Sequence, residues 1–178
     1  MGAPALWAAL ALLAGSIAGV EEAPAGGLAV ALHAQAYPEQ GGVIVGSVMT
    51  TNGLKRALLR TGRVRVAQSF YPFHYAGIAE ERWDLVVIEG WFEMSTAFIH
   101  EVRRLSPSVV VLYWCLDPSF PGLDAIAAID VDGYLTNSRA IAAELGRVAP
   151  VEVVFLAADL RAKESCERTG GKIAHQQN

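Results

Sequence analysis

The sequence predicts a single α/β domain of the Rossmann-like, doubly wound type, with a mostly parallel sheet and helices on both of its faces, over residues 41–160. Short apolar, β-branched runs alternate along the chain with segments whose apolar residues recur at helical spacing. Hydrophobic residues make up 53% of the chain and charged residues 18%, which suits a parallel sheet whose strands are buried on both faces. The length of 178 residues leaves room for one such domain.

The strands and helices are predicted in the order βαβ(α)βαβαβαβ, in which no range is assigned to the helix between the second and third strands. The predicted strands are Val43–Val48, Val64–Ser69, Trp83–Ile88, Ser108–Cys115, Asp132–Thr136 and Val151–Leu156. The predicted helices are Leu54–Thr61, Ser95–Leu105 with Ser95 as its N-cap, Gly122–Ile129 and Arg139–Arg147, and Thr50–Gly53 is predicted as a turn. Because helices separate the strands, we expect parallel pairing through right-handed crossovers.

The segments outside this domain are predicted from composition. Residues 1–20 contain almost no polar side chain and end in small residues before Glu21, which is typical of a secretory signal peptide. An uncleaved membrane anchor or an Ala-rich, non-targeting leader is the alternative. We therefore expect a secretory or extracytoplasmic protein, or a cytoplasmic one if the segment is no signal. Residues 21–40 are predicted as a linker, in which Leu28–His33 is an alternative short strand, and 161–178 as a disordered polar tail.

Charge and cysteine content argue against two classes of function. The net charge is −4, the pI is near 5.5, and no more than two Lys or Arg residues are adjacent, so we expect no nucleic-acid partner. The two cysteines, Cys115 and Cys166, form no CxxC or Cys/His cluster, so no metal site is predicted. Cys115 lies in an apolar run and is predicted to be a small buried residue.

Candidate site residues follow from the rule that ligands of open α/β sheets bind outside the carboxyl ends of the strands. Glu89 and Asp117 each follow an apolar strand and are the candidate catalytic residues, as general bases or hydroxyl ligands. The alternative for both is an ordinary strand-end acid or turn residue. The candidate substrate-binding residues are Ser47, Asn52, Gly53, His74, Gly90, Asn137, Ser138 and Asp159.

Three of these groups carry a specific expectation and an open alternative. The segment Gly46–Gly53 could present backbone amides to a phosphate or a sugar hydroxyl, or be an ordinary turn, and it matches neither GxGxxG nor GxxxxGK[ST]. His74 lies among aromatic residues that could wall a ring-shaped ligand or fold over the core. Asn137 and Ser138 could contact a ligand or cap a helix.

The last third of the chain carries an ordered set of motifs. Val109–Asp117 is an apolar strand ending in an acid, Asp130–Ser138 contains Asp-Gly-Tyr-Leu-Thr-Asn-Ser, and Val154–Asp159 follows after a helix. This set resembles the N-terminal lobe of GT-B glycosyltransferases, particularly the bacterial spore-maturation-type group. The resemblance covers about Val43–Asp159.

The resemblance implies a lobe that supplies acceptor contacts in an enzyme of the hexosyltransferase class. Its partners would be a nucleotide-sugar donor and a glycan or other hydroxyl acceptor, with no covalently bound cofactor. In that family the donor binds mainly to a second lobe, whereas here only 160–178 follow Asp159. We therefore expect catalysis to need a second lobe or another chain. The alternative is a non-catalytic Rossmann-like binding or interaction module.

Overall fold

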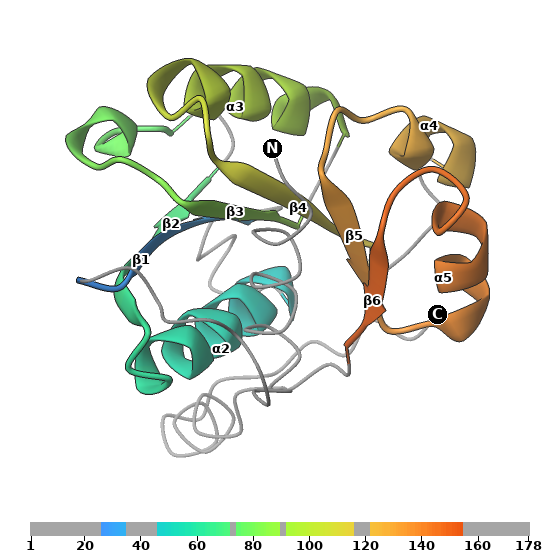
Figure 1. Ribbon diagram of the computed structural model, residues 1–178, viewed down its shortest axis with the longest axis horizontal. Coiled ribbons are helices and arrows are strands. Elements are labelled where there is room, and N and C mark those ends of the chain that lie inside the picture. The colour runs from blue at the N-terminus through green and yellow to red at the C-terminus, as the bar shows by residue number, and fades with distance from the viewer. Residues whose placement is uncertain (1–25, 35–45, 72–73, 90–91, 116–121, 155–178) are drawn as a thin grey trace.

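The computed structural model describes residues 26–34, 46–71, 74–89, 92–115 and 122–154 (Figure 1). Strands and helices alternate along these residues. The strands are β1 (Leu28–His33), β2 (Val64–Phe70), β3 (Leu85–Ile88), β4 (Val110–Cys115), β5 (Gly133–Thr136) and β6 (Val151–Val153). The helices are α2 (Gly46–Arg60), the short 3-10 helix η1 (Ile78–Glu80), α3 (Phe92–Leu105), α4 (Leu123–Ala127) and α5 (Arg139–Leu145).

The six described strands form one parallel sheet in the order β2-β1-β3-β4-β5-β6. The predicted α/β, doubly wound class is therefore confirmed. From β1 the chain moves outward to β2, and from β3 it moves in the opposite direction to β6. The order reverses between β1 and β3, so this is the topological switch point, where ligands of such sheets bind.

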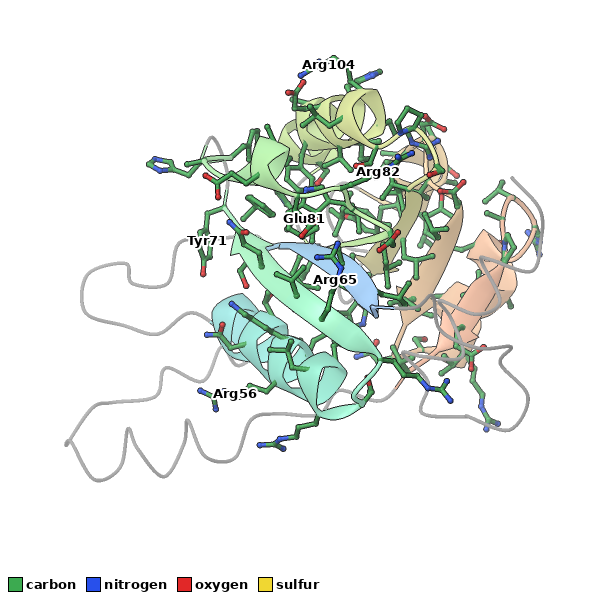
Figure 2. The ribbon with its side chains drawn as sticks, turned by 60° about the vertical axis from the view of Figure 1, so that its left-hand side comes forward. Arg56, Arg65, Tyr71, Glu81, Arg82 and Arg104 are labelled. Atoms are coloured by element: carbon green, nitrogen blue, oxygen red, sulfur yellow. The ribbon has the colours of Figure 1, made fainter. Side chains whose placement is uncertain are left out.

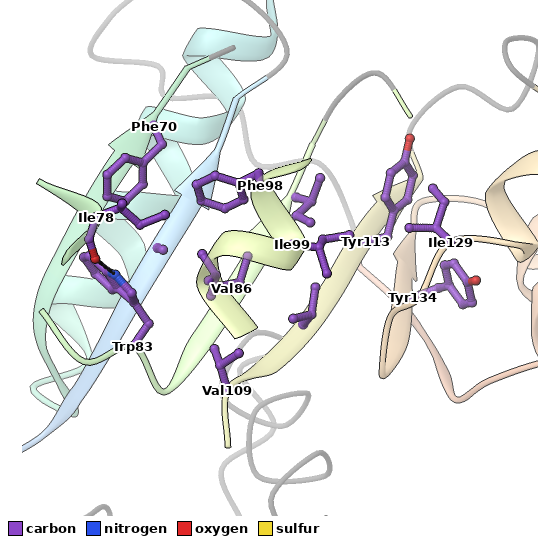
Figure 3. Close-up of a cluster of buried hydrophobic side chains, with 14 of the residues drawn as sticks. Phe70, Ile78, Trp83, Val86, Phe98, Ile99, Val109, Tyr113, Ile129 and Tyr134 are labelled. Atoms are coloured by element: carbon purple, nitrogen blue, oxygen red, sulfur yellow. Dashed lines mark hydrogen bonds between the residues drawn. The ribbon is translucent and has the colours of Figure 1, made fainter. Parts of the chain in front are cut away.

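Helices cover both faces of the sheet, with α2 on one side and α3 on the other (Figure 1). Leu58 of α2 belongs to one buried apolar cluster with Val30 of β1 and Val87 of β3. On the opposite face, buried residues of α3, α4 and α5 share one apolar cluster with the sheet, and Figure 3 shows part of it. Right-handed crossovers that run in opposite directions from a switch point place their helices on opposite faces.

Two aspartates fix the starts of strands by accepting hydrogen bonds from a neighbouring strand. The Ala29 amide donates to Asp84 Oδ2 at 2.8 Å, and the Val111 amide donates to Asp132 Oδ2 at 2.8 Å. At this same end of the sheet Arg65 of the edge strand β2 forms a bidentate pair with Glu81, which follows η1 (Figure 2). These contacts serve the fold at the amino ends of the strands, away from the switch-point end.

The structure corrects the beginning of the predicted domain. The strand alternative for Leu28–His33 is confirmed, because β1 is central in the sheet and five of its six residues are buried. It lies within the segment predicted as a linker, so the described fold begins before residue 41. The strand predicted at Val43–Val48 is wrong for residues 46–48, which open α2, and residues 43–45 lie outside the described residues. β1 occupies the position between β2 and β3 in the sheet.

Two local predictions on the helices are also wrong. Thr50–Gly53 is not a turn but the interior of α2, whose inward side includes Thr51 and Leu58, seven residues apart and both buried. Ser95 does not cap α3, which begins at Phe92, and its side chain is fully buried. The other predicted strands and helices form. Their ends differ by a few residues, except that α2 begins eight residues before the predicted Leu54 and that residues 155–156 of the last predicted strand lie outside the described residues. Cys115 is buried as predicted.

Candidate functional site

The carboxyl ends of β1 and β3 bring His33 and Glu89 together at the switch point. His33 is the last residue of β1 and pairs in register with Ile88. Glu89 follows β3 directly, and its amide donates to the His33 carbonyl oxygen at 2.8 Å. Two ionisable side chains are thus fixed on adjacent strands at the place where the topology predicts a ligand.

Glu89 is a buried acid and not an exposed strand-end residue. Its side chain is 5% exposed, and Thr51 Oγ1 of α2 donates to its Oε2 at 3.0 Å. Burial raises the pKa of Glu89 to about 7, and the Thr51 hydrogen bond opposes that rise. A carboxyl group with a pKa near neutrality can accept or release a proton under ordinary conditions, as a general acid or base must.

His33 is buried without a hydrogen-bond partner for its ring. It is 1% exposed, and neither Nδ1 nor Nε2 has a partner among the described residues. Its ring lies against Phe98 of α3, with 4.7 Å between ring centroids, and near Tyr75 at 6.1 Å. Burial lowers the pKa of His33 to about 4, and the backbone groups of His33 and Glu89 near the ring partly oppose this. The imidazole is therefore neutral near pH 7.

The two side chains approach the switch point from opposite faces of the sheet. His33 packs against α3, whereas the Glu89 carboxylate reaches α2 through Thr51. The charge of Glu89 also acts on Tyr113 of β4, whose pKa is raised by burial first and then by the charges of Cys115 and Glu89. Side chains from β1, β3, β4 and α2 thus surround one end of the sheet.

Sequence reasoning missed both partners of Glu89. His33 lies in the predicted linker and Thr51 in the predicted turn, so neither side chain is among the candidate site residues. The signal that could have found His33 was its position at the end of the apolar run Leu28–Leu32, which is the pattern used for Glu89.

The segment Gly46–Gly53, predicted as a loop or turn between strand and helix, forms the beginning of α2 instead. Asn52 and Gly53 lie inside α2 and are half-buried, and Gly53 is not among the glycines with positive φ. Amides within a helix donate to carbonyls four residues earlier, so those of Asn52 and Gly53 cannot hold a phosphate. Ser47 is in the first turn of α2, where the structure describes its backbone and not its side chain.

His74 is exposed and does not join this group of side chains. Its backbone forms an isolated antiparallel bridge with Tyr71, with the His74 amide donating to the Tyr71 carbonyl at 2.9 Å. The aromatic residue of this loop that approaches the switch point is its neighbour Tyr75, through the contact with His33.

Asn137 and Ser138 lie at the carboxyl end of β5, and the structure gives the cap to Ser138. Its hydroxyl accepts from the Ile141 amide at 3.4 Å, at the start of α5, and Asn137 is exposed. The helix-capping alternative is therefore confirmed for Ser138. Asp117, Gly90 and Asp159 lie outside the described residues.

Comparisons with known proteins add no family to this geometry. No family model, no curated protein and no solved structure matched the chain. Across the described ranges, no three or more His, Cys, Asp or Glu side chains are grouped so that they could hold a metal ion. None of the described helices has the length and apolar character needed to cross a bilayer.

Proposed function

We propose that this chain is the acceptor-side lobe of a glycosyltransferase, and that the acceptor binds at the β1/β3 switch point. The observation that carries the proposal is Glu89, a buried carboxyl with a pKa of about 7 at the carboxyl end of a central strand. The motif resemblance to the N-terminal lobe of GT-B glycosyltransferases supports the same assignment. The nucleotide-sugar donor would be bound mainly by a second lobe or another chain.

In this proposal Glu89 is the proton acceptor. Its carboxylate takes the proton of an acceptor hydroxyl while that oxygen bonds to the anomeric carbon of the sugar and the nucleotide phosphate leaves. Thr51 orients the carboxylate by donating to Oε2, which leaves Oε1 for the acceptor. Desolvation keeps the basicity of Glu89 close to what proton transfer at neutral pH requires.

The second candidate is a non-catalytic Rossmann-like binding module. It is favoured by the roles of the residues that carry the resemblance, because Asp132 and Ser138 each hold backbone amides of the fold. Under this alternative Glu89 binds a hydroxyl group without moving a proton.

An NMR titration of the full chain tests whether the switch point binds an acceptor-like ligand. The probes are methyl β-D-glucopyranoside and UDP-glucose, added to roughly 10 mM to detect millimolar affinity. We expect the sugar to shift the amide resonances of Thr51 and Glu89. Glu89→Gln should weaken this response at least tenfold, and Glu144→Gln, which changes an exposed acid on α5, should leave it unchanged. Absence of shifts at Thr51 and Glu89 with both probes contradicts the proposal.

The pH dependence of binding tests the role of Glu89 under either candidate. An ionised carboxylate accepts a hydrogen bond from a hydroxyl, so we expect the affinity to rise as the pH passes through about 7. An affinity that is flat across this pH range contradicts a contact between Glu89 and the sugar.

A further inference from the structure

Positive charge is concentrated on α2, the turn after it and the start of β2. Residues 46–71, which the structure describes without a gap, contain five of the chain's 14 Lys and Arg residues and none of its 18 Asp and Glu residues. These five cations are Lys55, Arg56, Arg60, Arg63 and Arg65. Because the net charge of the whole chain is −4, this part of the molecule differs in sign from the rest.

The outer side of α2 exposes cations together with one apolar side chain. Arg56, Leu59 and Arg60 are exposed and lie three or four residues apart, on the side of the helix opposite to buried Leu58. Figure 2 shows Arg56 extending from the side of α2 that faces away from the sheet. Leu59 is 41% exposed, and among the described residues only Val148 is another large hydrophobic residue with an exposed side chain.

Acidic residues do not balance most of these cations. The arginines at the end of α3 and just after α5 form ion pairs with a Glu three residues earlier in the chain. α2 contains no Asp or Glu that could do the same. Within the described part of the chain, Lys55, Arg60 and Arg63 have no ion pair, whereas Arg65 pairs with Glu81. An unbalanced group of cations attracts an anionic partner.

The chemistry of this surface favours a flat anionic partner. We define the basic surface of α2 as Lys55, Arg56, Leu59, Arg60 and Arg63. Its cations stand on the convex outer side of a helix, with an apolar side chain between them. Peptides and single-stranded nucleic acids bind mainly in grooves with apolar or aromatic linings. A bilayer of anionic lipids is flat, attracts Lys and Arg to its headgroups and accepts an inserted apolar side chain.

We propose that the basic surface of α2 binds an anionic lipid bilayer, with its four cations at the headgroups and Leu59 inserted between them. α2 runs back from the carboxyl ends of the strands to the start of β2, and the basic surface belongs to its second half and the turn that follows. It therefore lies toward the end of the sheet opposite to Glu89. Binding there leaves the switch point open, so this inference does not depend on the proposed function.

Sedimentation of the full chain with lipid vesicles tests the proposal. The anionic probe is a vesicle of phosphatidylglycerol and phosphatidylcholine in equal parts, and the neutral probe is phosphatidylcholine alone. We expect binding to the anionic vesicles, at least tenfold weaker binding to the neutral ones, and release at about 1 M salt, where charges are screened within about 3 Å. Equal binding to both vesicles, as insertion of the apolar residues 1–20 would give, overturns the inference.

A matched pair of triple variants separates this surface from the net charge. The test variant is Lys55→Gln, Arg60→Gln, Arg63→Gln. The control removes the same charge from exposed arginines around α3 and α5, as Arg104→Gln, Arg139→Gln, Arg147→Gln. Each Lys or Arg near an anionic bilayer contributes about fivefold in affinity, so the test variant should bind at least tenfold more weakly than the control. Urea unfolding checks that both variants fold.

Two results of this comparison contradict the proposal. Equal weakening in the two triple variants shows that net charge alone governs the binding. Binding of the parent chain to single-stranded DNA or polyglutamate, without binding to anionic vesicles, assigns its charged surface to another class of partner. A further variant, Leu59→Gln, should weaken vesicle binding without changing its salt dependence, and an unchanged affinity refutes the insertion of Leu59.

Discussion

The buried groups His33 and Glu89 should impose opposite pH dependences on the stability of the fold. Burial raises the pKa of Glu89 to about 7, so between about pH 4.5 and 7 the folded state keeps a proton that the unfolded chain has lost. Its stabilising effect is full below the unfolded pKa and is lost as the pH rises through 7. Burial lowers the pKa of His33 to about 4, so between about pH 4 and 6.5 the unfolded chain binds a proton that the folded state lacks. Proton binding to His33 in the unfolded chain therefore lowers the stability of the fold as the pH falls.

The magnitudes follow from the two shifts. One proton of difference between folded and unfolded states changes the free energy of unfolding by about 1.4 kcal/mol per pH unit. Across its window Glu89 therefore removes about 3 kcal/mol as the pH rises, and His33 adds about 3 kcal/mol. Where the windows overlap, between about pH 4.5 and 6.5, the two slopes cancel in the parent protein. Glu81, whose pKa Arg65 lowers to about 2, changes its charge below this overlap.

Single variants should reveal the pH dependence of the free energy of unfolding that each residue contributes. Relative to the parent, Glu89→Gln is expected to gain stability by about 1.4 kcal/mol per pH unit as the pH rises through the overlap, and His33→Phe to lose as much. The double variant should return to a flat difference. Urea unfolding followed by tryptophan fluorescence measures these free energies. Difference curves that are flat for both single variants would refute the burial of ionisable groups at the switch point.

Three further substitutions test particular contacts. Thr51→Val removes the donor that lowers the pKa of Glu89. The pH at which the fold loses the stabilising effect of protonated Glu89 should therefore rise, as measured by the same urea unfolding experiments. An unchanged pH for this loss contradicts the prediction. Asp132→Ala leaves an amide of β4 unpaired and should cost about 1–3 kcal/mol in urea unfolding, with a loss below about 0.5 kcal/mol speaking against it. Ser138→Ala removes the cap of α5 and should lower the free energy of unfolding by about 1 kcal/mol, whereas Asn137→Ala, at an exposed residue, should lower it by less than about 0.5 kcal/mol. Equal losses in the two variants would contradict the capping role of Ser138.

The sequence predicts most of the sheet because the central strands carry their signal locally. Val86 and Val111 belong to apolar runs buried on both faces, and such runs need no tertiary information to be recognised. The first strand was ambiguous because two apolar runs, Leu28–His33 and Val43–Val48, compete for one position in the sheet. Only the assembled sheet decides between them, by pairing β1 with both β2 and β3.

The candidate site was predictable only where strand ends were correctly located. Glu89 follows an unambiguous strand, and the carboxyl-end rule selects it. His33 and Thr51 escaped prediction because their roles depend on contacts between segments distant in the chain, such as the Thr51–Glu89 hydrogen bond across 38 positions. The burial that shifts both pKa values is a tertiary property that no local pattern encodes.

The motif that carries the family resemblance is largely explained by the fold itself. Asp132 accepts the Val111 amide, the Thr136 hydroxyl accepts the Ser138 amide at 3.2 Å, and Ser138 caps α5. Asp84, which precedes β3 and lies outside the motif, likewise accepts a hydrogen bond from the amide of a neighbouring strand, that of Ala29 in β1. A parallel strand that begins beside another and leads into a helix needs such groups whatever the protein does.

It follows that the motif supports a Rossmann-like strand and helix more strongly than it supports glycosyl transfer. Two residues at the switch point have no such role in the fold: His33, whose two ring nitrogens have no partner among the described residues, and Glu89, a buried acid with a pKa of about 7. Proteins retain such costly groups mainly where function uses them. The choice between a glycosyltransferase lobe and a binding module is therefore decided at the switch point, by what His33 and Glu89 bind and whether a proton moves.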